Sequence, residues 1–428
     1  MFAVYVLLVH LAFLLLWPVL LLHPRLRAGL AARLGIHPRH WPGLGPGPRI
    51  WLHGASAGDL LALQPVIAAL RQQLPECRLL LTTVTNTGMA LARQGRLGVD
   101  AVGYLPYDLP WAVARVVRRV RPAVLVLEYA EVWPALIRCA DRAGARILIS
   151  NGRFHERALG RYRWLYRLIG NPLARVDRLC MRDPIEAQHA LAIGAPADRV
   201  RVTGNTKFDR VAAIAAADPE AEAELRRALG VQPGDRLWVA GSTHEGEEGL
   251  LLGVFADLRR DRPDLRLVIA PRYPERAGRL CDLAAERGLD CGLRSAGAGR
   301  EPVLVLDTVG ELARLYRLAT VVFVGGSFVE RGGQNILEPA ACARPVLFGP
   351  HMENFADSVR VLQGRGGIQL PDAARLQRTL AELLDSPDEL ERLGRMAQQA
   401  VRSVSGASQA NAEAIAELLA AGQSEPQT

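Results

Sequence analysis

Residues 320–348 read TVVFVGGSFVERGGQNILEPAACARPVLF. The apolar run 320–324 predicts a strand that ends abruptly at Gly325-Gly326-Ser327. A second glycine pair precedes a short helical pattern that carries Asn335 and Glu338 three positions apart. The apolar run 345–348 then predicts another strand. This order of strand, glycine loop, helix and strand is typical of a parallel α/β sheet.

The same unit suggests a ligand. Two adjacent glycines let a phosphate approach bare backbone N–H groups close to a helix N-terminus. A carboxylate one helical turn further on, here Glu338, could hold the two hydroxyls of a ribose. We expect Gly325, Gly326 and Glu338 to bind an activated sugar nucleotide. Glycosyl transfer is therefore the leading hypothesis.

Strand and helix patterns alternate on both sides of this unit, which predicts two doubly wound, Rossmann-like domains facing a cleft. Ligands of such sheets lie beyond the carboxyl ends of the strands. A length of 428 residues also favours two domains. We expect a membrane anchor at residues 1–24, a basic linker at 25–48, an acceptor-binding domain at 49–208 and a donor-binding domain at 209–428.

The composition narrows the class of protein. Half of the residues are hydrophobic and the net charge is +8, which suits either nucleic acid or an anionic membrane. No RNP-type pattern is present, so a nucleic-acid partner is not expected. The cysteines are scattered, which predicts free or buried thiols in a reducing compartment and no zinc site: Cys77, Cys139, Cys180, Cys281, Cys291 and Cys342.

The N-terminal segment is the clearest non-catalytic signal. Residues 2–22 are apolar apart from His10, and a helix of this length spans roughly the 30 Å hydrocarbon core. Five arginines and no acidic residue follow up to Arg49, which places that side in the cytoplasm. A basic start and a small-residue cleavage site are missing, so an uncleaved anchor is favoured over a signal peptide. A helix lying in the membrane interface is the alternative.

Polar residues after the first-domain strands are candidates for acceptor chemistry. Asp59 stands at the start of a predicted helix, so it either caps that helix or acts as the general base. Glu131 either caps the next helix or binds an acceptor hydroxyl or amine. Ser56, in the same turn as Asp59, is the second candidate acceptor contact.

Cationic residues could offset the charge of a leaving phosphate. Lys207 is the only lysine of the chain and falls at the predicted domain junction; it is either a catalytic point charge or a leftover surface residue. Arg272, at a predicted strand end, could bind a phosphate with two hydrogen bonds. Arg276 reads as a solvated helix residue. Thr243 reads as the cap of a helix that has Glu247 in its first turn.

The chain resembles the bacterial 3-deoxy-D-manno-octulosonic acid (Kdo) transferases along essentially its whole length. The resemblance is carried by motifs in a fixed order: His53–Asp59, Tyr107–Pro110, Glu131–Pro134, Gly204–Asp209, Ser242–Glu248, Pro271–Arg276, Asp307–Leu312, Gly325–Pro339 and Phe348–His351. It implies a GT-B glycosyltransferase at the cytoplasmic face of the bacterial inner membrane. The implied donor is CMP-Kdo and the implied acceptor a lipid A precursor, with neither a metal nor a cofactor.

The resemblance also implies residue roles. Arg272, Gly326, Ser327, Asn335 and Glu338 match the donor-binding motifs, and Asp59 matches the catalytic carboxylate. No metal motif such as HExxH or DxD is visible in the sequence, in agreement with that implication.

Some positions depart from the family pattern. Asp59 replaces a usual Glu, and Tyr129-Ala130-Glu131 replaces Glu-Thr-Glu, so one carboxylate is missing unless Glu128 substitutes for it. Tyr273 and Gln334 stand where His is usual. These departures leave two alternatives open: a related transferase with another acceptor or donor, and a catalytically silent, membrane-tethered nucleotide-sugar binding protein.

Overall fold

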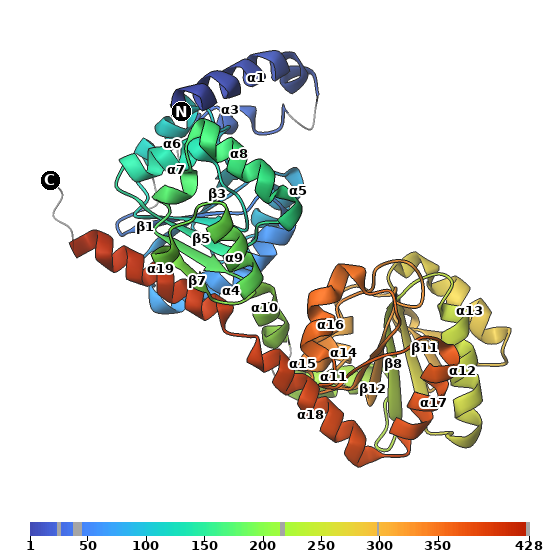
Figure 1. Cartoon of the computed structure of the whole chain (residues 1–428). Coiled ribbons are helices and arrows are strands. Elements are labelled where there is room, and N and C mark those ends of the chain that lie inside the picture. The colour runs from blue at the N-terminus through green and yellow to red at the C-terminus, as the bar shows by residue number, and fades with distance from the viewer. Residues whose placement is uncertain (24–26, 37–44, 215–218, 298, 425–428) are drawn as a thin grey trace. The chain divides into compact units, whose positions relative to one another are not determined.

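The computed structural model describes residues 1–23, 27–36, 45–214, 219–297 and 299–424. The chain forms two compact units (Figure 1). The first comprises Met1–Arg210 together with Ser405–Thr428, and the second comprises Val211–Val404. Each unit contains its own parallel sheet, so the predicted pair of α/β domains is confirmed.

The first unit is built on a seven-stranded parallel sheet with the order β3-β2-β1-β4-β5-β6-β7. Aliphatic runs form the central strands because helices cover both faces and exclude water from them. The strands are β1 Arg49–His53, β2 Arg78–Thr83, β3 Ala101–Tyr104, β4 Val124–Glu128, β5 Arg146–Gly152, β6 Arg178–Met181 and β7 Val200–Val202. The helices are α1 Phe2–Leu22, α3 Leu30–Arg33, α4 Ala57–Gln73, α5 Asn86–Ala92, α6 Pro110–Val120, α7 Pro134–Arg142, α8 Leu159–Ile169, α9 Pro184–Ala192, α10 Thr206–Ile214 and α19 Ala407–Ser424.

The second unit repeats this plan with the strand order β10-β11-β9-β8-β12-β13-β14, again all parallel. Its strands are β8 Arg236–Thr243, β9 Leu265–Pro271, β10 Cys291–Leu293, β11 Val303–Val305, β12 Val321–Val324, β13 Val346–Phe348 and β14 Gly367–Gln369. Its helices are α11 Pro219–Ala228, α12 Glu248–Asp261, α13 Ala277–Ala285, α14 Leu312–Leu315, α15 Leu337–Ala341, α16 Ala356–Leu362, α17 Ala373–Leu384 and α18 Pro387–Ser403.

The domain boundary differs from the predicted one at the C-terminus. The sequence analysis assigned all of 209–428 to the second domain, whereas α19 returns to the first unit. Ala412, Ile415 and Leu419 of α19 are buried in the hydrophobic core that contains α4 and the strands beside it. The terminal helices were expected to stay with the second domain because a helical pattern alone does not reveal which core its apolar face will join.

The cysteine prediction is wrong at one pair. Cys281 of α13 and Cys291 of β10 form a disulfide, with their Cα atoms 5.4 Å apart. The four other cysteines are free thiols: Cys77, Cys139, Cys180 and Cys342. A separation of ten residues without a recognisable motif gave no sequence signal for this pairing.

The position of α19 leads to a first prediction. Ile415→Ala should lower the free energy of unfolding of the first unit by about 2–5 kcal/mol, because it leaves a cavity in a closed core. Hydrogen exchange in the full chain should show faster exchange in β1, β4 and β5. Exchange in β8, β9 and β12 should not change.

Glu413→Ala, on the exposed face of the same helix, is the matched control and should have little effect. Faster exchange in the second unit after the Ile415 substitution would contradict the assignment of α19 to the first unit.

Candidate functional site

The predicted acceptor residues lie close to the carboxyl ends of the strands in the first unit. Parallel strands all end at one edge of their sheet, so side chains that follow neighbouring strands meet there. His53 ends β1, and Glu128 at the end of β4 pairs in register with Ser150 of β5. The motifs around Asp59, Glu131 and Asn151 therefore emerge at the same edge.

Asp59 closes a capping box at the start of α4. Its Oδ2 accepts the Ser56 N–H at 2.8 Å, and its own N–H donates to Ser56 Oγ at 3.4 Å. Gly54 makes the tight turn possible, because a Cβ there would lie 2.9 Å from the Asp59 Cβ. The capping interpretation of Asp59 is confirmed. The cap engages one of the two carboxylate oxygens, so it is compatible with a second role.

Glu131 does not cap α7. The N–H groups of Ala135 and Leu136, at the start of that helix, donate to Asp108 instead. Glu131 Oε2 accepts the indole N–H of Trp133 at 2.9 Å and lies 3.6 Å from Nε2 of the buried His53. The capping alternative is therefore wrong, and the half-buried Glu131 carboxylate is held at the strand edge by Trp133.

Glu128 and its neighbours form a buried polar cluster. The Glu128 side chain is fully buried, and its Oε1 accepts the Asn151 amide at 3.0 Å. Its Oε2 and Asn151 Oδ1 have no hydrogen-bond partner within the described part of the chain. Burial raises the pKa of Glu128 to about 8, and the charge of Asp59 adds to the rise, whereas Asn151, Ser150 and Lys207 oppose it. Glu128 is therefore mostly protonated at neutral pH.

Asn151 of this cluster and Tyr129, the residue after Glu128, adopt left-handed backbone conformations. Tyr129 has φ = 58° and Asn151 has φ = 52°. Such values are costly for a residue with a bulky side chain and concentrate at functional sites. Tyr129, which stands where the family has a carboxylate, thus turns its ring out of the regular strand path.

Lys207 lies near this ring. Its Nζ is 5.4 Å from the centroid of Tyr129, within cation–π range. The Lys207 side chain is exposed in the first unit, but partial desolvation of its ammonium group lowers its pKa. The positive charges of Arg153 and Arg182 lower this pKa further. Asp59 and Glu128 oppose the lowering. The structure thus brings Lys207, Asp59 and Glu128 into one electrostatic neighbourhood.

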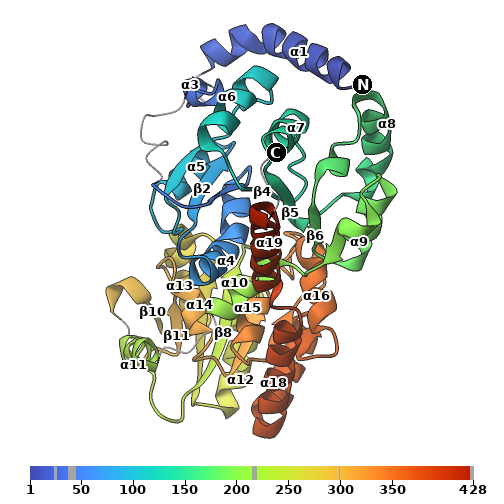
Figure 2. The same ribbon diagram turned by 90° about the vertical axis from the view of Figure 1, so that its left-hand side faces the viewer.

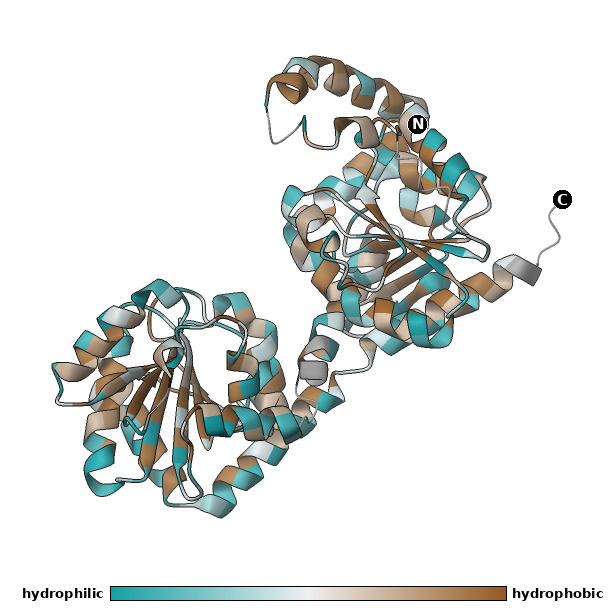
Figure 3. Ribbon diagram, turned by 180° about the vertical axis from the view of Figure 1, so that it is seen from behind, coloured by the Kyte–Doolittle hydropathy of each residue, from teal (hydrophilic) through white to brown (hydrophobic). Residues whose placement is uncertain are grey.

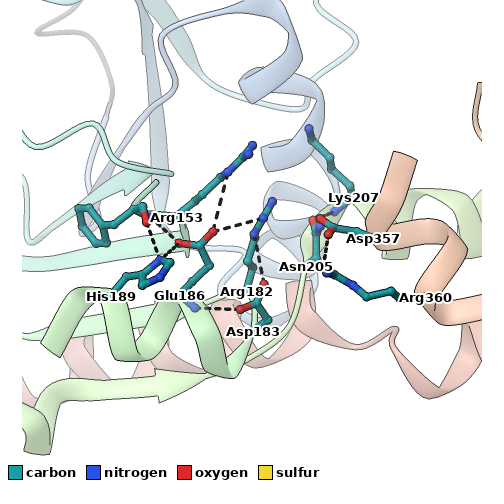
Figure 4. Close-up of polar contacts among 10 residues, drawn as sticks. Arg153, Arg182, Asp183, Glu186, His189, Asn205, Lys207, Asp357 and Arg360 are labelled. Atoms are coloured by element: carbon teal, nitrogen blue, oxygen red, sulfur yellow. Dashed lines mark hydrogen bonds and ion pairs between the residues drawn. The ribbon is translucent and has the colours of Figure 1, made fainter. Parts of the chain in front are cut away.

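Two arginines that the sequence analysis did not identify extend this neighbourhood (Figure 4). The buried Glu186 accepts a hydrogen bond from Arg182 at 3.3 Å and lies 3.9 Å from Arg153. Its other oxygen accepts the Phe154 N–H at 2.7 Å. One buried carboxylate therefore fixes both guanidinium groups at the ends of β5 and β6.

The glycine loop of the second unit is held by Glu247. This fully buried carboxylate accepts the N–H groups of His244, Gly326 and Phe328 at 2.8, 2.6 and 3.2 Å. Burial raises the pKa of Glu247, while these backbone donors oppose the rise. Because the Gly325 N–H also has an acceptor, Gly241 O at 2.8 Å, both glycine N–H groups are already engaged within the unit.

The two glycines are still required by the geometry of the loop. Gly326 has φ = 65°, and a Cβ there would lie 3.1 Å from the His244 ring. At Gly325 a Cβ would lie 2.5 Å from Glu247 Oε1. The loop thus packs its bare backbone directly against Glu247 and His244.

Thr243 does not cap the helix as predicted. Its hydroxyl donates to Glu248 at 3.3 Å, and α12 begins at Glu248.

Arg272 follows β9 and lies within electrostatic range of the His244 ring. Burial lowers the pKa of His244, and the nearby charges of Arg331, Arg272 and Arg276 lower it further. His244 Nε2 is buried and makes no hydrogen bond within the described residues. The His244 ring, the charges of these arginines and the backbone of Gly326 therefore lie close together beyond the ends of β8, β9 and β12.

The other predicted donor residues have internal roles. The buried Ser327 donates to Val324 O at 2.5 Å and accepts the Gly349 N–H at 2.9 Å, so its hydroxyl ties the ends of β12 and β13 together. Asn335 donates to Glu338 Oε1 at 3.0 Å and accepts the Leu337 N–H at 3.1 Å. This pair fixes the orientation of the Glu338 carboxylate in the first turn of α15.

Arg276 is not a solvated residue. It pairs with the buried Glu248 at 2.8 Å and with Glu245 at 3.0 Å.

Among the described residues, no three His, Cys, Asp or Glu side chains are placed to share a metal ion. A cavity of about 720 Å³ in the first unit lies at the N-terminal end of α1 and contains none of the predicted site residues.

Comparison with known proteins identifies the relatives of this chain. Residues 28–210 match the family described as 3-Deoxy-D-manno-octulosonic-acid transferase (kdotransferase). The 3-deoxy-D-manno-octulosonic acid transferase of Chlamydia pneumoniae is 32% identical over 87% of this chain and 85% of its own length. That of Haemophilus influenzae is 31% identical over 90% of both chains.

Solved structures support the fold. A glycosyltransferase from Rickettsia africae ESF-5 superimposes with a TM-score of 0.58 and 14% identity, over 88% of this chain and 99% of the other. At that identity the likeness shows the fold, two parallel α/β domains of GT-B type, and nothing of the substrate.

The protonated Glu128 leads to a prediction about pH. An acid whose pKa is higher in the folded than in the unfolded state loses stability as pH rises between the two values, by up to about 1.4 kcal/mol per pH unit. Between pH 4.5 and about 8, Glu128→Gln should therefore become progressively more stable relative to wild type. Thermal unfolding measured across that range checks this.

Glu413→Gln, on the exposed face of α19, should leave the pH profile unchanged. Parallel profiles for wild type and Glu128→Gln would show that Glu128 is ionised in the folded protein.

Proposed function

Because the chain belongs to the 3-deoxy-D-manno-octulosonic acid (Kdo) transferase family, we propose that it moves Kdo from CMP-Kdo to a lipid A precursor, with inversion and without a metal ion. Both the membership and the GT-B fold make it a Kdo glycosyltransferase. The donor, the acceptor and the stereochemistry are the proposed part.

One observation carries the proposal on the donor side. In the second unit, the His244 ring lies against the bare backbone of Gly326, and Arg272, which follows β9, acts on His244 electrostatically at the edge where sheets of this type bind nucleotides. Arg272 would hold the phosphate of CMP, since its fork of donors matches phosphate oxygens. Because the Gly325 N–H already donates to Gly241 O and the Gly326 N–H to Glu247, the glycines would act by allowing close approach. Glu338, oriented by Asn335, would accept hydroxyl groups of the ligand.

The first unit would supply the base. Asp59 would take the proton from the acceptor hydroxyl while that oxygen forms a bond to the anomeric carbon of Kdo. The bond from the anomeric carbon to the phosphate oxygen breaks on the opposite side, and CMP leaves with the electron pair. Lys207, close to Asp59, would stabilise the developing negative charge, and Ser56 and Glu131 would contact the acceptor.

The location follows the same reasoning. An apolar N-terminal helix and an arginine-rich surface would keep the enzyme at the cytoplasmic face of the bacterial inner membrane, where a lipid acceptor is available. A second candidate function is a related transferase with a different acceptor. The left-handed Tyr129, which occupies a position where the family has a carboxylate, favours it.

Asp59→Asn separates the two roles of Asp59. Asparagine can still accept the Ser56 N–H, so the capping box and the fold should persist, whereas the base is lost. We expect kcat for Kdo transfer from CMP-Kdo to a tetraacyl disaccharide acceptor to fall about 100-fold or more, with CMP affinity unchanged. Full activity of Asp59→Asn would leave Asp59 as a helix cap only.

Arg272→Lys tests the donor site. A lysine keeps the charge but cannot donate two parallel hydrogen bonds to phosphate. We expect the dissociation constant for CMP, measured by calorimetry, to rise about tenfold, which corresponds to one bidentate interaction of roughly 1.4 kcal/mol. Arg260→Lys, on an exposed position of α12 in the same unit, is the control and should bind CMP as wild type does.

A further inference from the structure

The N-terminal helix α1 packs lengthwise on the first unit. Figures 1 and 2 show it at the same end of that unit as α3, α6, α7 and α8. Phe2 and Tyr5 pack against the hydrophobic core, Phe13 stacks on Tyr107 with ring centroids 5.8 Å apart, and Leu20 is buried. The contacts extend over the whole length of the helix, so one of its faces belongs to the protein.

A buried polar contact fixes this arrangement. The Tyr5 hydroxyl donates to Asp108 Oδ2, and Asp108 is only 6% exposed. The same carboxylate caps α7 through the N–H groups of Ala135 and Leu136. At the other side of Tyr5, the Arg138 guanidinium lies 4.4 Å from the centre of the Phe2 ring. Pulling α1 away would break the hydrogen bond that the Tyr5 hydroxyl donates to Asp108.

The opposite face of α1 is exposed and apolar, as the hydropathy colouring of Figure 3 shows. Leu7, Leu11, Leu14, Leu15 and Leu22 are 69, 52, 69, 71 and 82% exposed. They recur with helical spacing and form one stripe. An exposed apolar stripe of this length marks a surface that binds an apolar partner.

Basic and aromatic residues surround the stripe. On α8, which packs against α1, Trp164 is 65% exposed. On α6, Trp111 is 42% exposed. Exposed arginines on these two helices make no ion pair with a described residue: Arg115, Arg118, Arg119, Arg161, Arg163 and Arg167. Tryptophan is typical of the membrane–water interface, and arginine complements anionic headgroups.

We propose that α1 lies in the plane of one membrane leaflet, docked on the first unit through Tyr5 and Asp108, and does not cross the bilayer. A crossing helix of this length would need lipid on all its faces, whereas one face here is occupied by protein from Phe2 to Leu20. The leucine stripe would enter the acyl region of an anionic leaflet, and the tryptophans and arginines would contact its headgroups. This inference concerns the mode of membrane attachment and does not depend on the proposed reaction.

The position of the N-terminus decides between the two topologies. A short polar tag that carries one cysteine is added before Met1 of the full chain, together with Cys139→Ser and Cys342→Ser, which remove the partly exposed thiols. A membrane-impermeant maleimide is applied to spheroplasts and to inside-out vesicles. We expect the tag cysteine to react only in inside-out vesicles, as does Asp198→Cys, a control at a surface residue of the first unit. Reaction in spheroplasts would show a crossing helix and overturn the proposal.

The leucine stripe is tested by flotation with vesicles. Leu11→Glu with Leu15→Glu should reduce partitioning of the full chain into phosphatidylglycerol vesicles about tenfold or more. Leu191→Glu, an exposed leucine on α9, is the matched control and should float as wild type does. If the double variant floats normally and instead converts a dimer into a monomer, the stripe is covered by a second copy of the chain, and the proposal is wrong.

The polar contact has its own test. Tyr5→Phe removes a single hydroxyl and leaves the Asp108 cap of α7 intact, so the domain should fold. We expect α1 to be cleaved faster by protease in detergent, with unchanged cleavage elsewhere. Unchanged cleavage of α1 would mean that Tyr5 and Asp108 do not hold the helix.

Discussion

Buried carboxylates that accept backbone N–H groups hold the loops at the carboxyl edges of both sheets. A parallel strand that ends in a loop leaves N–H groups without ladder partners, and each must find an acceptor away from water. Glu247 serves the glycine loop, Glu186 serves the turn after β5, and Asp108 serves the start of α7. The candidate donor and acceptor residues are placed by these loops, so their geometry depends on carboxylates that never need to touch a ligand.

Burial of the strands explains which parts of the fold could be predicted from the sequence. Apolar runs flanked by glycine predicted β12 and β13 to within one residue of their observed bounds, 321–324 and 346–348, because both strands are buried on both faces. The short strands β3, β6, β10 and β14 were not predicted, since three or four residues, partly exposed in most of them, give little periodicity. The order of the motifs predicted the family, and the comparisons with known proteins confirm that prediction.

The sequence predicted which residues lie near the candidate site better than it predicted what each of them contacts. Asp59 and Arg272 stand at strand ends, where the pattern placed them. The backbone contacts of Ser327 and Glu247 were not predicted, because a hydroxyl or carboxylate in a motif does not reveal which groups it will bind. Arg153 and Arg182 carry no motif and gain significance only through Glu186. The same limit applies to α1, whose apolar sequence suits a crossing helix, whereas the Tyr5–Asp108 contact and its one-sided packing do not.

Tyr129 and Glu128 together change the electrostatics beside Lys207. The family resemblance leads us to expect a carboxylate at position 129, where this chain has an aromatic ring, and the adjacent Glu128 carboxyl group is buried and held protonated at neutral pH. A carboxylate at position 129 would neutralise Lys207, whereas the Tyr129 ring leaves its charge available and partly shields it from water. Under the proposed reaction, the charge of Lys207 would favour an acceptor that carries phosphate or carboxylate groups near the reacting hydroxyl.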